Sequence, residues 1–124
     1  MNAKQGRIIL AVALAAAPVS PPVAAAPLQC TFDHRLECDR RGCEPGSVVG
    51  VWDQIDQVRG SYARCSSRGC DVYVAGFMQS GAFTVISLPG INVMAKLSVA
   101  ERDLVEVGIL GMNVVISYGS CHPE

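Results

Sequence analysis

The sequence is poor in the residues and motifs on which many enzymes depend. Its 124 residues include only two histidines, His34 and His122. It contains no Gly-x-Ser-x-Gly elbow, no paired-carboxylate motif and no glycine-rich phosphate loop, which are signatures of common hydrolases and nucleotide-binding enzymes. Two isolated histidines near the ends of a small domain are more typical of exposed residues than of a catalytic dyad. We therefore predict no enzymatic activity, no cofactor and no metal site.

Long hydrophobic runs are also scarce, and the one present lies at the N-terminus. Lys4 and Arg7 precede an apolar stretch over residues 8–17, and a Pro/Ala segment over residues 18–26 follows it. This order is typical of a secretory signal peptide, and the apolar stretch is too short for a transmembrane helix. We predict a signal peptide over residues 1–25, with cleavage near Ala25/Ala26, and a periplasmic or secreted location without a membrane span. An uncleaved membrane anchor is the alternative.

Positive charge is not in excess. Without Lys4 and Arg7, eight basic residues stand against eleven acidic residues in the rest of the chain. Surfaces that bind nucleic acid or anionic membranes need a positive footprint. The sequence therefore predicts no nucleic-acid partner, and it leaves the identity of a protein or small-molecule partner open.

Cysteine is the residue type that the mature chain does have. An even number in a small exported chain predicts a disulfide framework. Six cysteines allow fifteen pairings, and the spacing favours two short loops and one bridge between the ends of the domain. Thiol redox chemistry and a zinc site are the alternatives, but neither Cys-x-x-Arg-Gly-Cys unit begins a helix, and oxidation competes with metal binding in an exported protein. The predicted pairs are Cys30–Cys121, Cys38–Cys43 and Cys65–Cys70.

Alternating apolar and polar residues dominate the second half of the chain. The alternation is clearest over residues 91–99, 104–110 and 113–118, and a period of two is typical of β-strands. Short polar or glycine-containing links join these runs, which predicts an antiparallel meander. A helical turn is expected only around residues 97–105.

The first half of the mature chain predicts further short strands. Residues 28–34, 48–55, 62–65, 70–78 and 82–88 supply them, with a turn at Ser80-Gly81, and Asp53, Asp56 and Arg59 are expected on the solvent side of their strand or at its exit. Together the patterns predict one all-β domain over residues 26–124. We expect a small antiparallel β-sandwich or flattened barrel, a meander of about seven or eight short strands stapled by disulfides.

The chain resembles a group of small exported proteobacterial proteins of uncharacterised function. The resemblance rests on Gln29-Cys30, on the pair Cys38 and Cys43, and on the closing segment from Val114 to Cys121. It implies a disulfide-stapled β domain and supplies no active site. The unit formed by Cys65 and Cys70 is not part of this shared pattern.

A weaker resemblance is to periplasmic lysozyme inhibitors of the small β-barrel type, which also join the chain's ends by a disulfide. Cys30 and Cys121 are the matching points, and the segment from Gly60 to Arg64 resembles the loop that such inhibitors insert into lysozyme. The candidate interaction loop is Gly60, Ser61, Tyr62 and Arg64. Two functions are therefore open: a non-enzymatic binding or interaction domain, and an inhibitor of a secreted hydrolase such as lysozyme.

Overall fold

The computed structural model describes residues 26–124, so the expected signal peptide over residues 1–25 lies outside the described residues. Ten strands and one short 3₁₀ helix follow one another along the chain. They are β1 (Leu28–Asp39), β2 (Gly42–Pro45), β3 (Val51–Asp56), β4 (Ser61–Ser66), β5 (Gly69–Val74), β6 (Gly76–Ser80), β7 (Phe83–Leu88), η2 (Pro89–Ile91), β8 (Val93–Ser98), β9 (Asp103–Leu110) and β10 (Asn113–Pro123).

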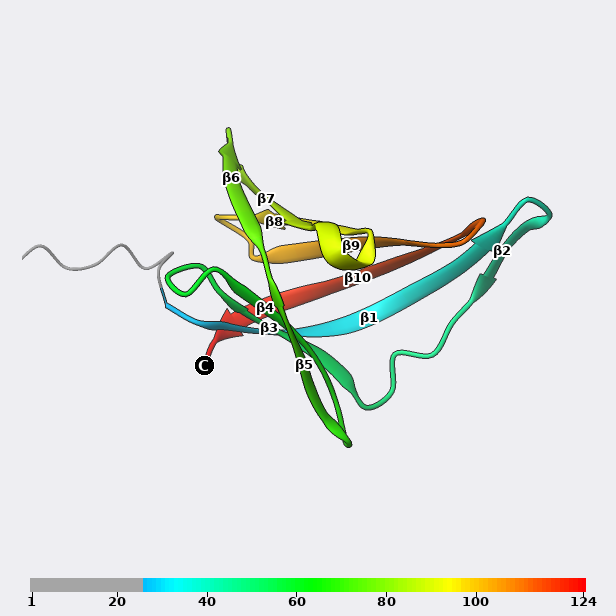
Figure 1. Ribbon diagram of the computed structural model, residues 1–124, viewed down its shortest axis with the longest axis horizontal. Helices are drawn as coiled ribbons and strands as arrows, with labels where there is room; N and C mark the ends of the chain where they lie inside the picture. The colour runs from blue at the N-terminus through cyan, green and yellow to red at the C-terminus, as the bar shows by residue number, and fades with distance from the viewer. Residues whose placement is uncertain (1–25) are drawn as a thin grey trace, which may run out of the picture.

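The strands form one antiparallel sheet that curls into a nearly closed barrel. Its order is β5-β4-β3-β1-β10-β9-β8-β7-β6, and β2 pairs with β1 alongside this path. The two end strands, β5 and β6, are separated only by Ala75 and run on as one crossing segment (Figure 1). The chain therefore passes from one end of the sheet to the other at a single buried residue. The all-β, barrel-type prediction is confirmed, with more strands than expected.

Strands β1 and β10 hold the middle of the sheet. Their register runs from Leu28 opposite Pro123 to Cys38 opposite Val114, with an irregularity between Phe32 and His34. Gly119 lies opposite Phe32 at this irregularity, and a side chain there would overlap the backbone of Thr31. The absence of a side chain at Gly119 allows β1 to lie this close to β10 where it bends.

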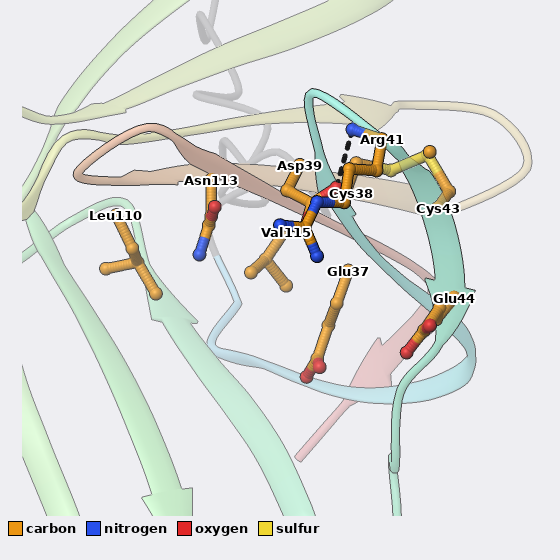
Figure 2. Close-up of a pocket in the computed structure, with 10 residues that line it drawn as sticks. Glu37, Cys38, Asp39, Arg41, Cys43, Glu44, Leu110, Asn113 and Val115 are labelled. Atoms are coloured by element: carbon orange, nitrogen blue, oxygen red, sulfur yellow. Dashed lines mark hydrogen bonds between the residues drawn. A yellow bond between two sulfur atoms is a disulfide. The ribbon is translucent and has the colours of Figure 1, made fainter.

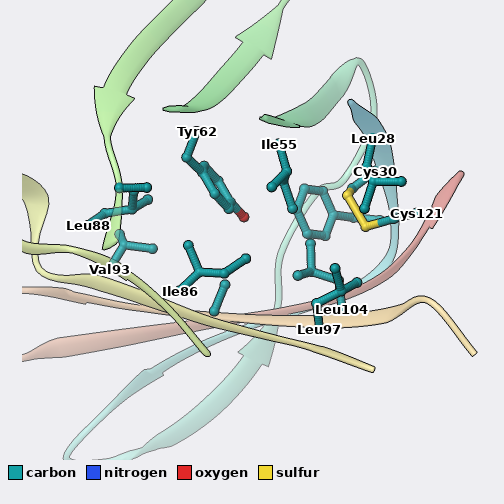
Figure 3. Packing of buried hydrophobic residues seen from close by; sticks show 13 residues of the cluster. Leu28, Cys30, Ile55, Tyr62, Ile86, Leu88, Val93, Leu97, Leu104 and Cys121 are labelled. Carbon is teal, nitrogen blue, oxygen red and sulfur yellow. A yellow bond between two sulfur atoms is a disulfide. The ribbon is translucent and has the colours of Figure 1, made fainter. Parts of the chain in front are cut away.

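The core fills the inside of the barrel, where residues from opposite walls meet (Figure 3). Alternate residues of each strand point inward, as the pleat of a strand requires. The buried cluster contains Leu28, Cys30, Phe32, Ile55, Tyr62, Ala75, Ile86, Leu88, Val93, Ala95, Leu97, Leu104 and Cys121.

The sequence-based placement of Asp53 is wrong, and the inward face of β9 includes an acidic residue. In β9 the inward face carries Leu104 and Glu106, whereas Val105 and Val107 are only partly buried and Ile109 is exposed. Asp53, expected on the solvent side, is buried in β3. A period of two separates the two faces of a strand but does not tell which face lies inside. Here the interior accepts two carboxyl groups because both have hydrogen-bond partners.

One helical turn lies in the expected region around residues 97–105, and a 3₁₀ helix lies outside it. The 3₁₀ helix occupies Pro89–Ile91, where proline fixes a helical φ at the first position. Between β8 and β9 the chain makes a single turn, in which the amide of Arg102 donates to the carbonyl of Ser98 at 2.8 Å. Arg102 has a positive φ of 58°, which ends the turn and starts β9.

Candidate functional site

All six cysteines are joined in the pairs that the spacing predicted. The bonds are Cys30–Cys121, Cys38–Cys43 and Cys65–Cys70, and no free cysteine is found within residues 26–124. The first bond joins the two central strands inside the barrel, where Cys30 is fully buried. The other two close hairpins, between β1 and β2 and between β4 and β5. The cysteines are therefore structural.

A cluster of polar side chains crosses the inside of the barrel. The hydroxyl of Tyr62 on β4 lies 2.6 Å from Oδ2 of Asp53 and 2.7 Å from Oε2 of Glu106. A guanidinium nitrogen of Arg64 lies 3.0 Å from the second oxygen of Glu106. In the sheet order β4 and β9 are separated by β3, β1 and β10. The cluster therefore ties together two walls of the barrel that are not neighbours in the sheet.

The cluster must hold a proton on one of its carboxyl groups. A tyrosine hydroxyl has one proton to donate, and both of its short contacts here are to carboxyl oxygens. Burial, together with the neighbouring Glu106, raises the pKa of Asp53 from 3.8 to about 9. Burial opposes ionisation of Glu106, but Asp53 and the Arg64 guanidinium lower its pKa overall. We therefore assign a neutral Asp53 that donates to Tyr62, which in turn donates to an ionised Glu106.

Three members of this cluster, Asp53, Tyr62 and Glu106, are sealed from solvent, whereas the Arg64 side chain is 38% exposed. Asp53 and Glu106 are each 3% exposed, and Tyr62 is 0% exposed. Burial also raises the pKa of Tyr62 well above its ordinary value, so the ring stays neutral. The groups resemble an acid–base pair in type, but a ligand in solution has no direct contact with them. What the arrangement can do is store one proton in the interior.

An open pocket lies at one mouth of the barrel, on the inner side of two projecting hairpins. Its volume is about 550 Å³, and it lies between the β1–β2 hairpin and the turn from β9 to β10 (Figure 2). Apolar and polar groups share its wall. The lining includes Glu37, Asp39, Arg41, Glu44, Leu110, Asn113 and Val115. We call this the mouth pocket.

Two carboxylates stand side by side in the mouth pocket. Glu37 on β1 is the direct cross-strand partner of Glu44 on β2, and Figure 2 shows both side chains extending in the same direction. Like charges directly opposite one another destabilise a sheet. The ion pairs found within residues 26–124 are Arg59–Asp56 and Arg64–Glu106, so neither Glu37 nor Glu44 is in an ion pair. Arg41 lines the same pocket. Leu110, which is 62% exposed, adds an apolar side chain to this mostly polar lining.

The predicted interaction loop is not a loop. Ser61, Tyr62 and Arg64 belong to strand β4, and only Gly60 lies in the turn before it. Tyr62 is buried and Arg64 is held in the ion pair with Glu106. The expectation of an exposed Gly60–Arg64 loop is wrong, because the inward face of β4 supplies the tyrosine and the arginine of the buried cluster.

The histidines are separate from each other and from the cluster. His34 lies opposite Tyr118, and His122 lies opposite Gln29, on the same pair of strands but in different parts of it. Both histidine side chains are exposed. The disulfide between Cys30 and Cys121 therefore brings their strands together without making a dyad.

Sequence reasoning missed Asp53 and Glu106 as partners. One signal was present: Glu106 interrupts an apolar run and falls on the face opposite Val105 and Val107. The contact itself joins residues 44 positions apart, Tyr62 and Glu106, across strands that do not pair. Periodicity carries no information about such a contact.

Comparisons of the chain with protein families, with curated proteins and with solved structures give no match. Within residues 26–124, no cluster of three or more histidine, cysteine, aspartate or glutamate side chains is suited to a metal ion. In the same part of the chain, no helix has the length and the apolar character needed to span a bilayer. The functional interpretation therefore rests on the residues of this chain and their geometry.

Proposed function

We propose that this protein is an exported, non-enzymatic binding domain whose ligand site is the mouth pocket. The ligand combines a cationic group with an apolar part. One observation carries the proposal: within the described residues Glu37 and Glu44 are direct cross-strand neighbours, neither is in an ion pair, and the exposed Leu110 lines the same pocket. A local arrangement that costs stability is typical of a functional site. A cation between the two carboxylates would remove their repulsion.

The framework around the pocket supports this function. The β1–β2 hairpin is closed by Cys38–Cys43, and β1 is paired with β10 along most of its length. The second wall, from β9 to β10, is a paired hairpin as well. A site held by such elements loses little conformational entropy when a ligand binds, and this loss is a main cost of association.

The disulfides also support export. Three disulfides in one small domain are typical of oxidising compartments, such as the periplasm or the cell exterior. The predicted signal peptide over residues 1–25 points in the same direction. We therefore place the binding function outside the cytoplasm.

A titration with arginine amide tests the proposal. This probe carries a guanidinium on an aliphatic stem. We expect saturable NMR shift changes at the backbone amides of Glu37, Glu44 and Leu110, which weaken as salt is added, since exposed charges are screened. The double variant Glu37→Gln/Glu44→Gln should lose these changes. Glu101→Gln, an exposed acid outside the pocket lining, is the matched control and should retain them.

Two outcomes would contradict a cation site in the mouth pocket. One is the absence of saturable changes in the wild-type protein. The other is a set of changes that survives in the Glu37→Gln/Glu44→Gln variant, which would place the probe elsewhere.

Inhibition of a secreted hydrolase such as lysozyme is the second candidate function. The predicted loop no longer supports it, but a pocket that contains Glu37, Glu44 and the exposed Leu110 also suits a lysine or arginine side chain on an enzyme surface. A lysozyme activity assay with the residue 26–124 protein distinguishes the two candidates. Inhibition that Glu37→Gln/Glu44→Gln abolishes would favour the inhibitor, whereas unchanged lysozyme activity together with arginine-amide binding would favour the small-ligand site.

A further inference from the structure

Within residues 26–124, strand β5 is an unpaired edge of the sheet, and its one charged residue is Asp71. It pairs with β4 on one side, and it ends the strand order on the other. Edges of natural sheets are commonly blunted by lysine, proline or a bulge. β5 contains neither of these residue types over Gly69–Val74, and its register with β4 runs unbroken through all six residues. Five of the six are exposed.

The backbone groups that face this edge can be identified. Cys65 and Cys70 are directly opposite, with Cα atoms 4.0 Å apart, which is the spacing of a pair that does not exchange hydrogen bonds. The N–H and C=O of Cys70 therefore point away from β4, and the alternation extends this to Val72 and Val74. The next residue agrees with the pattern, because the amide of Ala75 donates toward the β4 side, to Gly60.

Two of these edge residues, Val72 and Val74, also expose apolar side chains. Val72 is 67% exposed and Val74 is 87% exposed, and both lie on the face of the strand that carries Cys70. Asp71 and Tyr73 lie on the opposite face. A strand added along this edge would form hydrogen bonds and cover the two valines at once, which is the chemistry of β-strand addition.

We propose that β5 pairs with β5 of a second copy of this chain, antiparallel about a twofold axis at Val72. In this register Cys70 meets Val74, Val72 meets Val72, and all outward-facing backbone groups of both strands are hydrogen-bonded. Each Asp71 then lies opposite Tyr73 of the second copy, so no carboxylate lies opposite another. The interface is isologous, as a twofold dimer requires.

The neighbouring registers are less favourable. An axis at Asp71 sets two carboxylates against each other, and like charges directly opposite destabilise a pair of strands. An axis at Tyr73 leaves Cys70 without a partner. The sequence of β5 therefore selects one arrangement. The proposed dimer uses a surface separate from the mouth pocket, so the dimer proposal is independent of the proposed binding function.

The dimer is small and should be reversible. One six-residue edge buries less surface than a permanent interface requires. Sedimentation of the residue 26–124 protein over roughly 10 µM to roughly 1 mM, the range suited to a weak interface, should show a monomer that converts to a dimer. Hydrogen exchange on the same samples should show the amides of Cys70, Val72 and Val74 becoming protected only as the concentration rises.

Charge substitutions at the axis separate pairing from folding. Val72→Lys and Val72→Glu each place like charges opposite one another, so each variant alone should be monomeric. Mixed in equal amounts they should dimerise, which a folding defect would not produce. Met78→Lys on the other edge strand, β6, is the matched control, because Met78 is 63% exposed; it should dimerise like the wild type.

Several results would overturn the proposal. The first is a wild-type protein that stays monomeric to about 1 mM. The second is a dimer that persists in Val72→Lys or Val72→Glu alone. The third is a loss of the dimer in Met78→Lys, which would place the contact at β6 instead of β5. Folded Val72→Lys and Val72→Glu that fail to associate when mixed would also refute it. Protection of the three amides at every concentration would mean that the edge is covered within the monomer.

Discussion

Raising the pH from about 5 to about 8 should lower the free energy of unfolding by about 4 kcal/mol through one side chain, Asp53. The folded-state pKa of Asp53 is raised to about 9 from 3.8. Between these values the folded protein holds a proton on this group that the unfolded chain has released. Stability is therefore fully present below the unfolded pKa and is lost as the pH rises toward the folded pKa.

The size of the effect follows from the proton count. One proton of difference between the two states changes stability by about 1.4 kcal/mol per pH unit. Over about three units this gives about 4 kcal/mol, and the result holds for any folded-state pKa above the top of the range. Glu106 does not cancel it, because its pKa is lowered from 4.5. Its contribution is lost only as the pH falls below that window.

Asp53→Asn provides the test. The amide has nearly the shape of the acid and still donates toward Tyr62, but it does not ionise. Urea unfolding with the disulfides intact, followed by the fluorescence of Trp52, gives the stability of both proteins at each pH. The difference in unfolding free energy should shift by about 4 kcal/mol in favour of Asn between about pH 5 and about pH 8. A difference that stays constant across this range would refute the buried protonated carboxyl.

Two further perturbations test the framework. Replacing Cys30 and Cys121 by alanine should lower the free energy of unfolding by about 4–5 kcal/mol, because this bond closes a loop of 91 residues. Replacing Cys38 and Cys43, whose separation is 5, should lower it by only about 2 kcal/mol. Equal losses of the two double variants in urea unfolding would contradict loop closure as the cause. Gly119→Ala should cost about 3 kcal/mol, because the new methyl group overlaps the backbone of Thr31, whereas Gly90→Ala, with open space around it, should leave the melting temperature nearly unchanged.

The sequence predicted the parts of the fold that depend on neighbours along the chain. Strands β8, β9 and β10 follow from alternation, and the hairpin disulfides follow from spacing and export. The bridge from Cys30 to Cys121 was also predictable, because it was the pair left after the two short loops were closed.

What depends on three-dimensional closure was not predictable. Asp53 and Glu106 carry carboxyl groups, which a sequence-based interpretation assigns to the solvent side of a strand. Their burial is possible only because the hydroxyl of Tyr62 and the guanidinium of Arg64 are hydrogen-bonded to them or paired with them. The single-residue link at Ala75, which lets β5 and β6 end the sheet order, gives no periodic signal either. The mouth pocket arises from two hairpins distant in sequence.

The central position of β1 has a consequence for how the protein matures. In the export that we propose, the first strand emerges long before β10, its main partner. Cys30 then meets Cys38 and Cys43 before Cys121 arrives, so oxidation in order of appearance would join the wrong thiols. The native bonds include one between cysteines that are not consecutive. Maturation should therefore depend on thiol–disulfide exchange, and in a cell with an oxidase but no isomerase the chain should accumulate in misbridged forms.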